Sequence, residues 1–130
     1  MSVHVCPSTI DTIERMVDDS EGATLIKNSV IKRLEDMQRL RIERLHRVYD
    51  LLRRRGLSCY PKHPSWPDDW WRFVVYRPEL ATVHLATIAA DDELIAAAEC
   101  VQNAFRYPYA HENAPYPWQM HDALQKLAAA

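Results

Sequence analysis

The chain has 130 residues, of which 48% are hydrophobic and 26% are charged, and its formal net charge is −2. This composition predicts a single globular domain, residues 1–130, with its own hydrophobic core, and it excludes a disordered chain. No apolar run approaches the roughly 18 residues of a membrane-spanning helix, and the three cysteines lack tight spacing, which predicts a reduced, cytoplasmic protein that does not bind membranes.

Residues 1–7 are expected to form an extended arm in front of a short helix. Ser8 is the predicted N-cap of that helix, because Asp11 follows three residues later, as in a capping box. Apolar residues at helical spacing predict that the helix continues to about Asp19, where a turn rich in acidic residues and containing a glycine begins.

Residues 24–55 contain neither Gly nor Pro and consist mostly of good helix formers, which predicts one long central helix. Gly56 follows at the position where a left-handed residue commonly ends a helix. If this helix is continuous, its apolar residues cover on the order of half its circumference, more than an amphipathic surface helix usually shows. The centre of the apolar face consists of Ile26, Val30, Leu34, Met37, Leu45, Val48 and Leu52. We therefore expect a second copy of the chain, or later parts of the same chain, to cover it.

Two arginines, Arg41 and Arg44, interrupt this apolar face near its middle. The packing partner of the helix could change there, with the arginine stems lying over apolar neighbours. A functional cation could instead pair with a carboxylate from elsewhere in the chain, or the helix could be kinked near Arg41. We favour the first interpretation, because buried charges are rare without a partner.

Charge is distributed unevenly, since residues 27–55 contain ten Lys or Arg and four Asp or Glu, whereas both flanking segments are acidic. The interpretation that we favour locally is neutralisation within the fold, with acids of the first helix meeting Lys27, Lys32 or Arg33. The alternative is a face that binds the phosphates of a nucleic acid. The predicted phosphate contacts are Lys32, Arg39, Arg47, Arg53, Arg54 and Arg55.

A loop with three prolines separates the long helix from a predicted β-hairpin. Residues 70–77 are rich in aromatic and β-branched residues and predict a strand, and residues 81–89 predict a second strand. The connection between them is too short for a crossover helix, so we expect an antiparallel hairpin over residues 70–89.

Two C-terminal helices complete the predicted fold. Asp91 is the expected N-cap of a helix over residues 92–105, and Pro117 suits the first turn of a helix over residues 117–128. The predicted fold class is therefore α+β, mainly α, with a short N-terminal helix, a long central helix, a β-hairpin and two C-terminal helices.

Histidine and cysteine residues suggest a zinc site, although no CxxC or HxxxH pair supports it. The candidate zinc ligands are Cys59, His63, His111 and His121. Surface histidines and buried thiols are the competing interpretation. A Cys–His nucleophile would use Cys59 or Cys100, but Cys100 lies among alanines, where a buried inert thiol is expected. Gly-rich phosphate loops and the common hydrolase and zinc-protease motifs are absent, so we predict no cofactor.

Aromatic residues gather in the second half of the chain, close to prolines. Trp70 and Trp71 belong to the predicted strand, so we expect them in the core. The aromatic residues of the two loops fit core and interface equally well, because Tyr and Trp are prominent in both. The predicted interface residues are Tyr60, Trp66, Tyr107, Tyr109, Tyr116 and Trp118.

From these observations we expect a non-enzymatic protein-interaction module, an adaptor or inhibitor that forms a homodimer through the long helix and binds a further protein. Arginine outnumbers lysine twelve to four, which favours a GC-rich bacterial or phage genome. Nucleic-acid binding through the basic face is the first alternative. A small enzyme or zinc-binding protein is the second.

Overall fold

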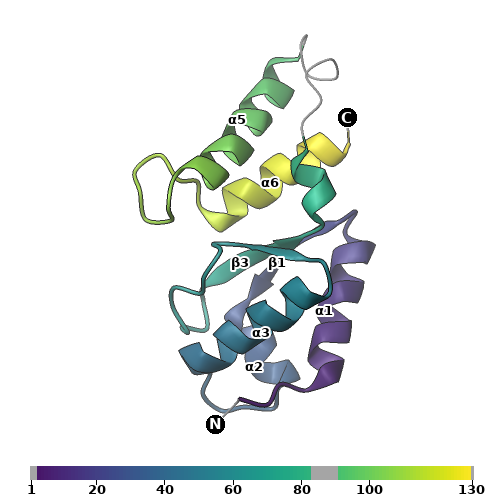
Figure 1. The fold of residues 1–130 in the computed structure, drawn as a ribbon, viewed down its shortest axis with the longest axis vertical. Helices are drawn as coiled ribbons and strands as arrows, with labels where there is room; N and C mark the ends of the chain where they lie inside the picture. Colours follow the sequence, from purple (N-terminus) through teal and green to yellow (C-terminus); the bar gives the residue numbers. More distant parts are fainter. Residues whose placement is uncertain (1–2, 83–90, 130) are drawn as a thin grey trace.

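The computed structural model describes residues 3–82 and 91–129 as a three-stranded antiparallel sheet with helices on both faces (Figure 1). The strands are β1 (Ala23–Lys27), β2 (Ser58–Tyr60) and β3 (Arg72–Tyr76), in the spatial order β1-β3-β2. The register places Ile26 opposite Phe73. Successive side chains of a strand point to opposite faces of a sheet, so the central strand β3 contributes to a separate core on each side.

The first helical layer covers one face of the sheet with α1 (Pro7–Asp19), α2 (Asn28–Leu34) and α3 (Ile42–Arg54). The helix α1 begins with its proline at the first helical position, one residue before the predicted N-cap Ser8. Gly56 has a φ angle of 79° and follows the end of α3, as predicted. The core of this layer includes Ile10, Ile13, Val17, Ile26, Leu45, Val48, Tyr49, Leu52, Phe73 and Val75.

The second helical layer consists of α5 (Asp92–Arg106) and α6 (Pro117–Ala128), and the short 3-10 helix η1 (Pro78–Ala81) packs against α6. Figure 1 shows α6 between the sheet and α5, which is outermost. The two predicted C-terminal helices are thus confirmed. The carboxylate of Asp91 caps α5 by accepting hydrogen bonds from the backbone N–H groups of Glu93 (2.9 Å) and Leu94 (3.3 Å). The second core includes Tyr60, Val74, Tyr76, Val101, Met120 and Leu124.

The predicted continuous helix over residues 24–55 is wrong. This stretch forms β1, α2, an irregular connection over residues 35–41, and α3. The β-branched residues Thr24 and Ile26 pair with β3, and this long-range pairing overrides the helix propensity of their neighbours. Asp36 follows α2 with a φ angle of 53°, a left-handed conformation that a right-handed helix cannot continue through.

A buried carboxylate explains why the chain turns back between α2 and α3. The side chain of Glu35 is fully buried, and it accepts hydrogen bonds from the backbone N–H of Cys6 (3.1 Å), from the hydroxyl of Thr9 and from the guanidinium of Arg44 (2.8 Å). Arg44 therefore pairs with a carboxylate, which was one part of the second interpretation, whereas the functional role that this interpretation gave to the cation stays a prediction. Arg41 is exposed and forms the N-cap of α3, where the chain breaks.

The broken helix also removes the surface through which the chain was expected to dimerise. Ile26, Leu45, Val48 and Leu52 from the predicted apolar face are buried in the first core of a single subunit. They lie on different elements that pack against one another, so they form no continuous surface for a second copy. None of the helices in the described part of the chain is long and apolar enough to cross a membrane.

The predicted hairpin over residues 70–89 is also wrong. Its first strand exists as β3, but β1 and β2 occupy both edges of β3, so no edge is free for a following strand. Sequence patterns miss this arrangement because both partners of β3 come from earlier in the chain. The predicted second strand, residues 81–89, falls mainly on residues 83–90, which lie outside the described residues.

Candidate protein interface

Six aromatic side chains, from two loops and the first turn of α6, form a cluster beside the sheet, which we call the aromatic patch. It consists of Trp66, Trp70, Trp71, Tyr109, Tyr116 and Trp118. Three of its members are uncovered, since 44% of Trp66, 65% of Trp70 and 53% of Tyr116 is exposed. Large aromatic residues with this much exposure in one contiguous area are unusual on a monomer and mark interaction sites.

Trp71 is the buried centre of the aromatic patch, with 3% of its surface exposed. The ring centroid of Trp66 lies 4.6 Å from that of Trp71, and the centroid of Trp70 lies 5.7 Å from it, both in edge-to-face geometry. Tyr109 and Trp118 contact the same ring at 5.8 Å and 6.2 Å. Edge-to-face pairs at these distances are favourable. The contacts with Trp71 therefore restrict the movement of the exposed rings of Trp66 and Trp70.

A single buried side chain fixes the loop that carries the three tryptophans. Asn28, the first residue of α2, is fully buried, and its amide donates hydrogen bonds to the backbone carbonyls of Trp66 (2.7 Å) and Asp68 (3.1 Å). Its backbone N–H donates to the carbonyl of Trp71 at 2.9 Å. A salt bridge of 2.6 Å between Lys32 and Asp69 adds a contact between α2 and the same loop. These bonds hold a loop without regular structure in one conformation.

The loop before α6 supplies the other side of the aromatic patch. Tyr116 is the N-cap of α6, and its ring stacks on Trp118 with 4.7 Å between centroids. The guanidinium of Arg72 lies over Trp118 at 5.2 Å, within the range of a cation–π contact. Tyr60, which is buried, donates a hydrogen bond from its hydroxyl to the carbonyl of Pro115 and joins this loop to the sheet edge.

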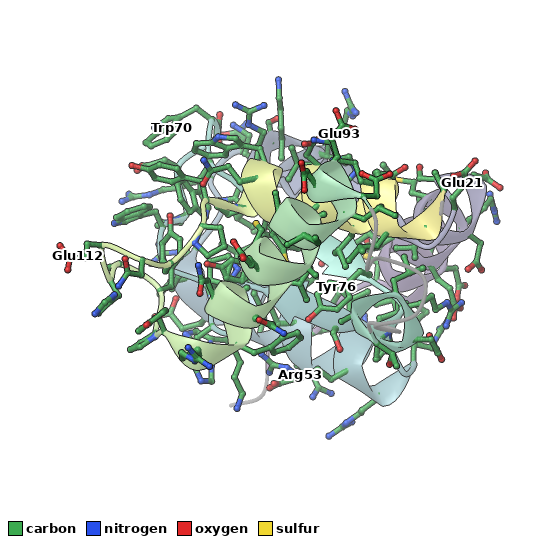
Figure 2. All side chains as sticks on the ribbon, turned by 90° about the horizontal axis from the view of Figure 1, so that it is seen from above. Glu21, Arg53, Trp70, Tyr76, Glu93 and Glu112 are labelled. Carbon is green, nitrogen blue, oxygen red and sulfur yellow. The ribbon has the colours of Figure 1, made fainter. Side chains whose placement is uncertain are left out.

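One border of the aromatic patch is acidic. A hollow of about 650 Å³ between α5 and α6 is bordered by Trp118 and by the carboxylates of Glu99, Glu112 and Asp122. Among the described residues that line it, Lys126 is the one cation, and Lys126 pairs with Asp122 at 3.2 Å. In Figure 2, Glu112 and Trp70 project on the same side of the molecule. The aromatic patch therefore lies beside a region of negative charge.

The other predicted interface residues lie outside the uncovered area. Tyr60 contacts Tyr109 with 6.0 Å between ring centroids, from inside the second core. Tyr107 stacks on His111 at 4.6 Å. The loop aromatics thus divide into members of the aromatic patch and two residues that lie below or beside it.

Half of the predicted phosphate contacts are engaged within the fold. Arg55 pairs with Asp11 (2.8 Å) and Glu14 (3.1 Å), Arg53 pairs with Asp50 (3.0 Å), and Lys32 pairs with Asp69 (2.6 Å). The remaining three, Arg39, Arg47 and Arg54, lie on the loop before α3 and on α3. The acids of α1 do neutralise basic residues, but their partners are Arg55 and Arg77 rather than Lys27, Lys32 or Arg33.

The candidate zinc ligands are spread over different environments. Cys59 is buried, His63 is exposed, His111 stacks on Tyr107, and His121 lies near the turn that precedes β1. Nowhere in residues 3–82 and 91–129 do three His, Cys, Asp or Glu side chains gather as a metal ion would need. The zinc hypothesis therefore finds no geometric support in this part of the chain.

Neither candidate nucleophile is activated by its surroundings. Burial raises the pKa of the Cys59 thiol to about 12. Burial also raises the pKa of Cys100, and the nearby carboxylate of Asp122 adds to that shift. A catalytic cysteine needs a lowered pKa, because the thiolate is the nucleophile, so both thiols are expected to remain protonated and inert at neutral pH.

Sequence reasoning missed two residues of this site. Trp70 was assigned to the core as part of a strand, but β3 begins two residues later at Arg72 and leaves Trp70 on the surface. The sequence predicts Asn28 within a long helix, and nothing in its local sequence indicates its bonds to residues 38 and 40 positions away. The available signal for a turn was the pair Asp68 and Asp69, directly before the two tryptophans at positions 70 and 71.

Comparisons of this chain with protein-family models, with curated proteins and with solved structures found no match.

Proposed function

We propose that this protein is a non-enzymatic interaction module that binds another protein through the aromatic patch. The observation that carries the proposal is the exposure of Trp66, Trp70 and Tyr116 around the buried Trp71. Tyr and Trp are enriched among the residues that dominate binding energy at interfaces. They provide a large contact area at a low cost in side-chain entropy. The hydrogen bonds from Asn28 to the loop lower the entropy cost further, because less of the loop has to be ordered on binding.

The chemistry of the surroundings favours a partner with basic residues. The carboxylates of Glu99 and Glu112 and the side chain of Asp68 form no salt bridge with any residue in the described ranges. Arg or Lys side chains of a partner would meet these carboxylates and could lie over the face of an exposed tryptophan. We therefore expect a partner surface that combines Lys or Arg with apolar residues.

The cytoplasm is the compartment that we propose for this interaction. All three cysteines are free, and Cys6 and Cys100 are partly accessible. Free thiols persist where glutathione and thioredoxin keep them reduced. An adaptor or inhibitor of a larger cytoplasmic protein would fit this setting.

The proposal is tested by capturing the partner with the wild-type chain and with two single variants. Trp70→Ala removes the most exposed ring of the aromatic patch, and Phe105→Ala removes a ring of nearly equal exposure that is not a member of the patch, in the last turn of α5 (65% and 64%). We expect Phe105→Ala to capture the same partner as the wild type and Trp70→Ala to lose it. Binding should also weaken as salt is raised, because the acidic border contributes.

Two outcomes would reject the proposal. One is retention of the partner by both Trp70→Ala and the double variant Trp66→Ala/Tyr116→Ala. The other is a dimer of the purified chain, measured by sedimentation equilibrium, that dissociates on Trp70→Ala, since the occupant of the aromatic patch would then be a second copy.

A further inference from the structure

A separate hollow of about 510 Å³ lies where the two helical layers part along the outer edge of β2. Its volume falls within the roughly 300–1,000 Å³ of typical small-molecule sites. Its lining includes the aromatic rings of Tyr60, Tyr76, Phe105, Tyr107 and Tyr109 and the side chain of Met120. In Figure 2, Arg53 and Tyr76 mark this side of the molecule, away from Trp70.

The rim of the hollow carries an unexplained apolar group. Phe105 lies in the last turn of α5, and 64% of it is exposed, although a phenyl ring gains free energy from burial. The chain turns away after α5, so Tyr107 and Tyr109 face the same hollow as Phe105. An apolar ligand in the hollow would cover the ring that the fold leaves open.

Both charged residues in the lining are cations. Arg53 and Lys62 line the hollow, and no Asp or Glu of the described chain does. Arg53 is held in place, because its guanidinium donates to the carbonyl of Lys62, pairs with Asp50 at 3.0 Å and lies 6.0 Å from the ring centroid of Tyr49. Lys62 is exposed and forms no salt bridge with any residue that the structure describes. A fixed guanidinium and an ammonium group without a salt bridge thus line the hollow beside the aromatic side chains.

We propose that this hollow binds a planar aromatic carboxylate. The ring system would lie among Phe105, Tyr107 and Tyr109, where aromatic rings stack or meet edge to face. The carboxylate would lie at the mouth and accept hydrogen bonds from Lys62, with Arg53 behind it. A lining of aromatic side chains with a small number of placed charges is the usual composition of a small-molecule site.

The position of Tyr109 connects this hollow to the aromatic patch. Tyr109 lines the hollow, and its ring lies 5.8 Å from Trp71 and 6.4 Å from Trp66. A ligand that shifts Tyr109 therefore changes the surroundings of two tryptophans. Tryptophan emission then reports on binding independently of the heat that binding releases.

The test uses naphthoic acid as the probe and its neutral carboxamide as the matched control, with titration calorimetry on the full chain. A probe of this size is expected to bind with a Kd of about 0.1–1 mM. The carboxamide should bind at least about fivefold more weakly, because it lacks the charge that Lys62 meets. Lys62→Gln and Phe105→Ala should each weaken binding of naphthoate about fivefold.

Two further variants separate this site from the aromatic patch. Ala104→Trp places a large side chain in the lining of the hollow and should abolish binding of naphthoate. Trp70→Ala, which lies outside the lining, should leave the Kd within about twofold of the wild type. If Ala104→Trp does not fold, as judged by circular dichroism, Lys62→Gln and Phe105→Ala carry the test, since both residues are exposed.

The inference is overturned if naphthoate does not bind at concentrations up to about 10 mM. It is also overturned if the carboxamide binds equally well, or if Lys62→Gln and Phe105→Ala both leave the Kd unchanged. None of these results tests the protein-binding role, because that role is tested by capture of the partner with Trp70→Ala.

Discussion

On the side of the sheet covered by α1, α2 and α3, several charged residues pair with one another and the large apolar residues are buried or partly buried. Arg55 and Arg77 meet the acids of α1, and Glu35 meets Arg44 in the interior. On the side covered by α5 and α6, three aromatic residues and Phe105 remain exposed, and the carboxylates of Glu99 and Glu112 have no partner within the described residues. The large apolar residues of the first side are covered, whereas the second side keeps large aromatic residues exposed, so binding is expected on the second side.

The largest effect should follow substitution at the centre of the first side. Phe73 is fully buried in β3, and its ring lies 4.7 Å from that of Tyr49. Phe73→Ala should lower the free energy of unfolding by about 3–5 kcal/mol, from lost burial and the cavity left behind. Urea denaturation measures it. A loss below about 1 kcal/mol would show that the first core is not packed as described.

The buried ion pair should give the next largest effect. Glu35→Ala removes the acceptor for Arg44, Thr9 and the backbone of Cys6, and it should cost about 2–3 kcal/mol. The value lies below that of a fully buried pair because 21% of the Arg44 side chain is exposed. Glu43→Ala, an exposed carboxylate at the start of α3, is the matched control and should change stability by less than about 0.5 kcal/mol. Equal losses in the two variants would contradict the role of Glu35.

Stability should fall at alkaline pH because of Cys59. Burial raises the pKa of this thiol from 9.0 to about 12, so the folded chain keeps a proton that the unfolded chain loses as pH rises above 9.0. The unfolded state then binds fewer protons, and the free energy of unfolding falls with pH. Between about pH 8 and pH 10, the loss should be about 1 kcal/mol greater in the wild type than in Cys59→Ala. Urea denaturation at both pH values measures the free energy of unfolding. The same decrease between the two pH values in the wild type and in Cys59→Ala would refute this prediction.

The smallest effect on stability is expected on the open side. Trp70→Ala should change the free energy of unfolding by less than about 1 kcal/mol, because 65% of this residue is exposed. The same urea denaturation as for Phe73→Ala measures it. A loss of unfolding free energy as large as that of Phe73→Ala would mean that Trp70 is a core residue and is not available to a partner.

The elements that were predictable from the sequence are those with local signals. Asp91 and Pro117 mark the starts of α5 and α6 in the sequence, and the structure places both helices where these residues indicate. The prediction of one helix over residues 24–55 was wrong because the points where the helix is interrupted depend on residues far away in the sequence. Ala23 pairs with Tyr76, and Glu35 finds Cys6 and Thr9. No helix propensity contains that information.

The candidate site was predictable to a similar degree. Trp66 and Tyr116 are in proline-containing loops, where strands and helices are disfavoured, and the sequence places both outside the regular elements. Trp118 lies in the first turn of α6, within the helix predicted over residues 117–128. Trp70 was misassigned because an aromatic run next to β-branched residues resembles a strand. The hollow beside β2 brings together residues from five separate segments, so no sequence window could indicate it.

The most direct test of the aromatic patch as a binding surface is the affinity of the captured partner for Trp70→Ala and for Phe105→Ala, measured by titration calorimetry beside the wild type. We predict a loss of at least about 2 kcal/mol, or roughly thirtyfold in Kd, for Trp70→Ala, and a Kd within about twofold of the wild type for Phe105→Ala. Equal affinities of the partner for the wild type and Trp70→Ala would contradict the account.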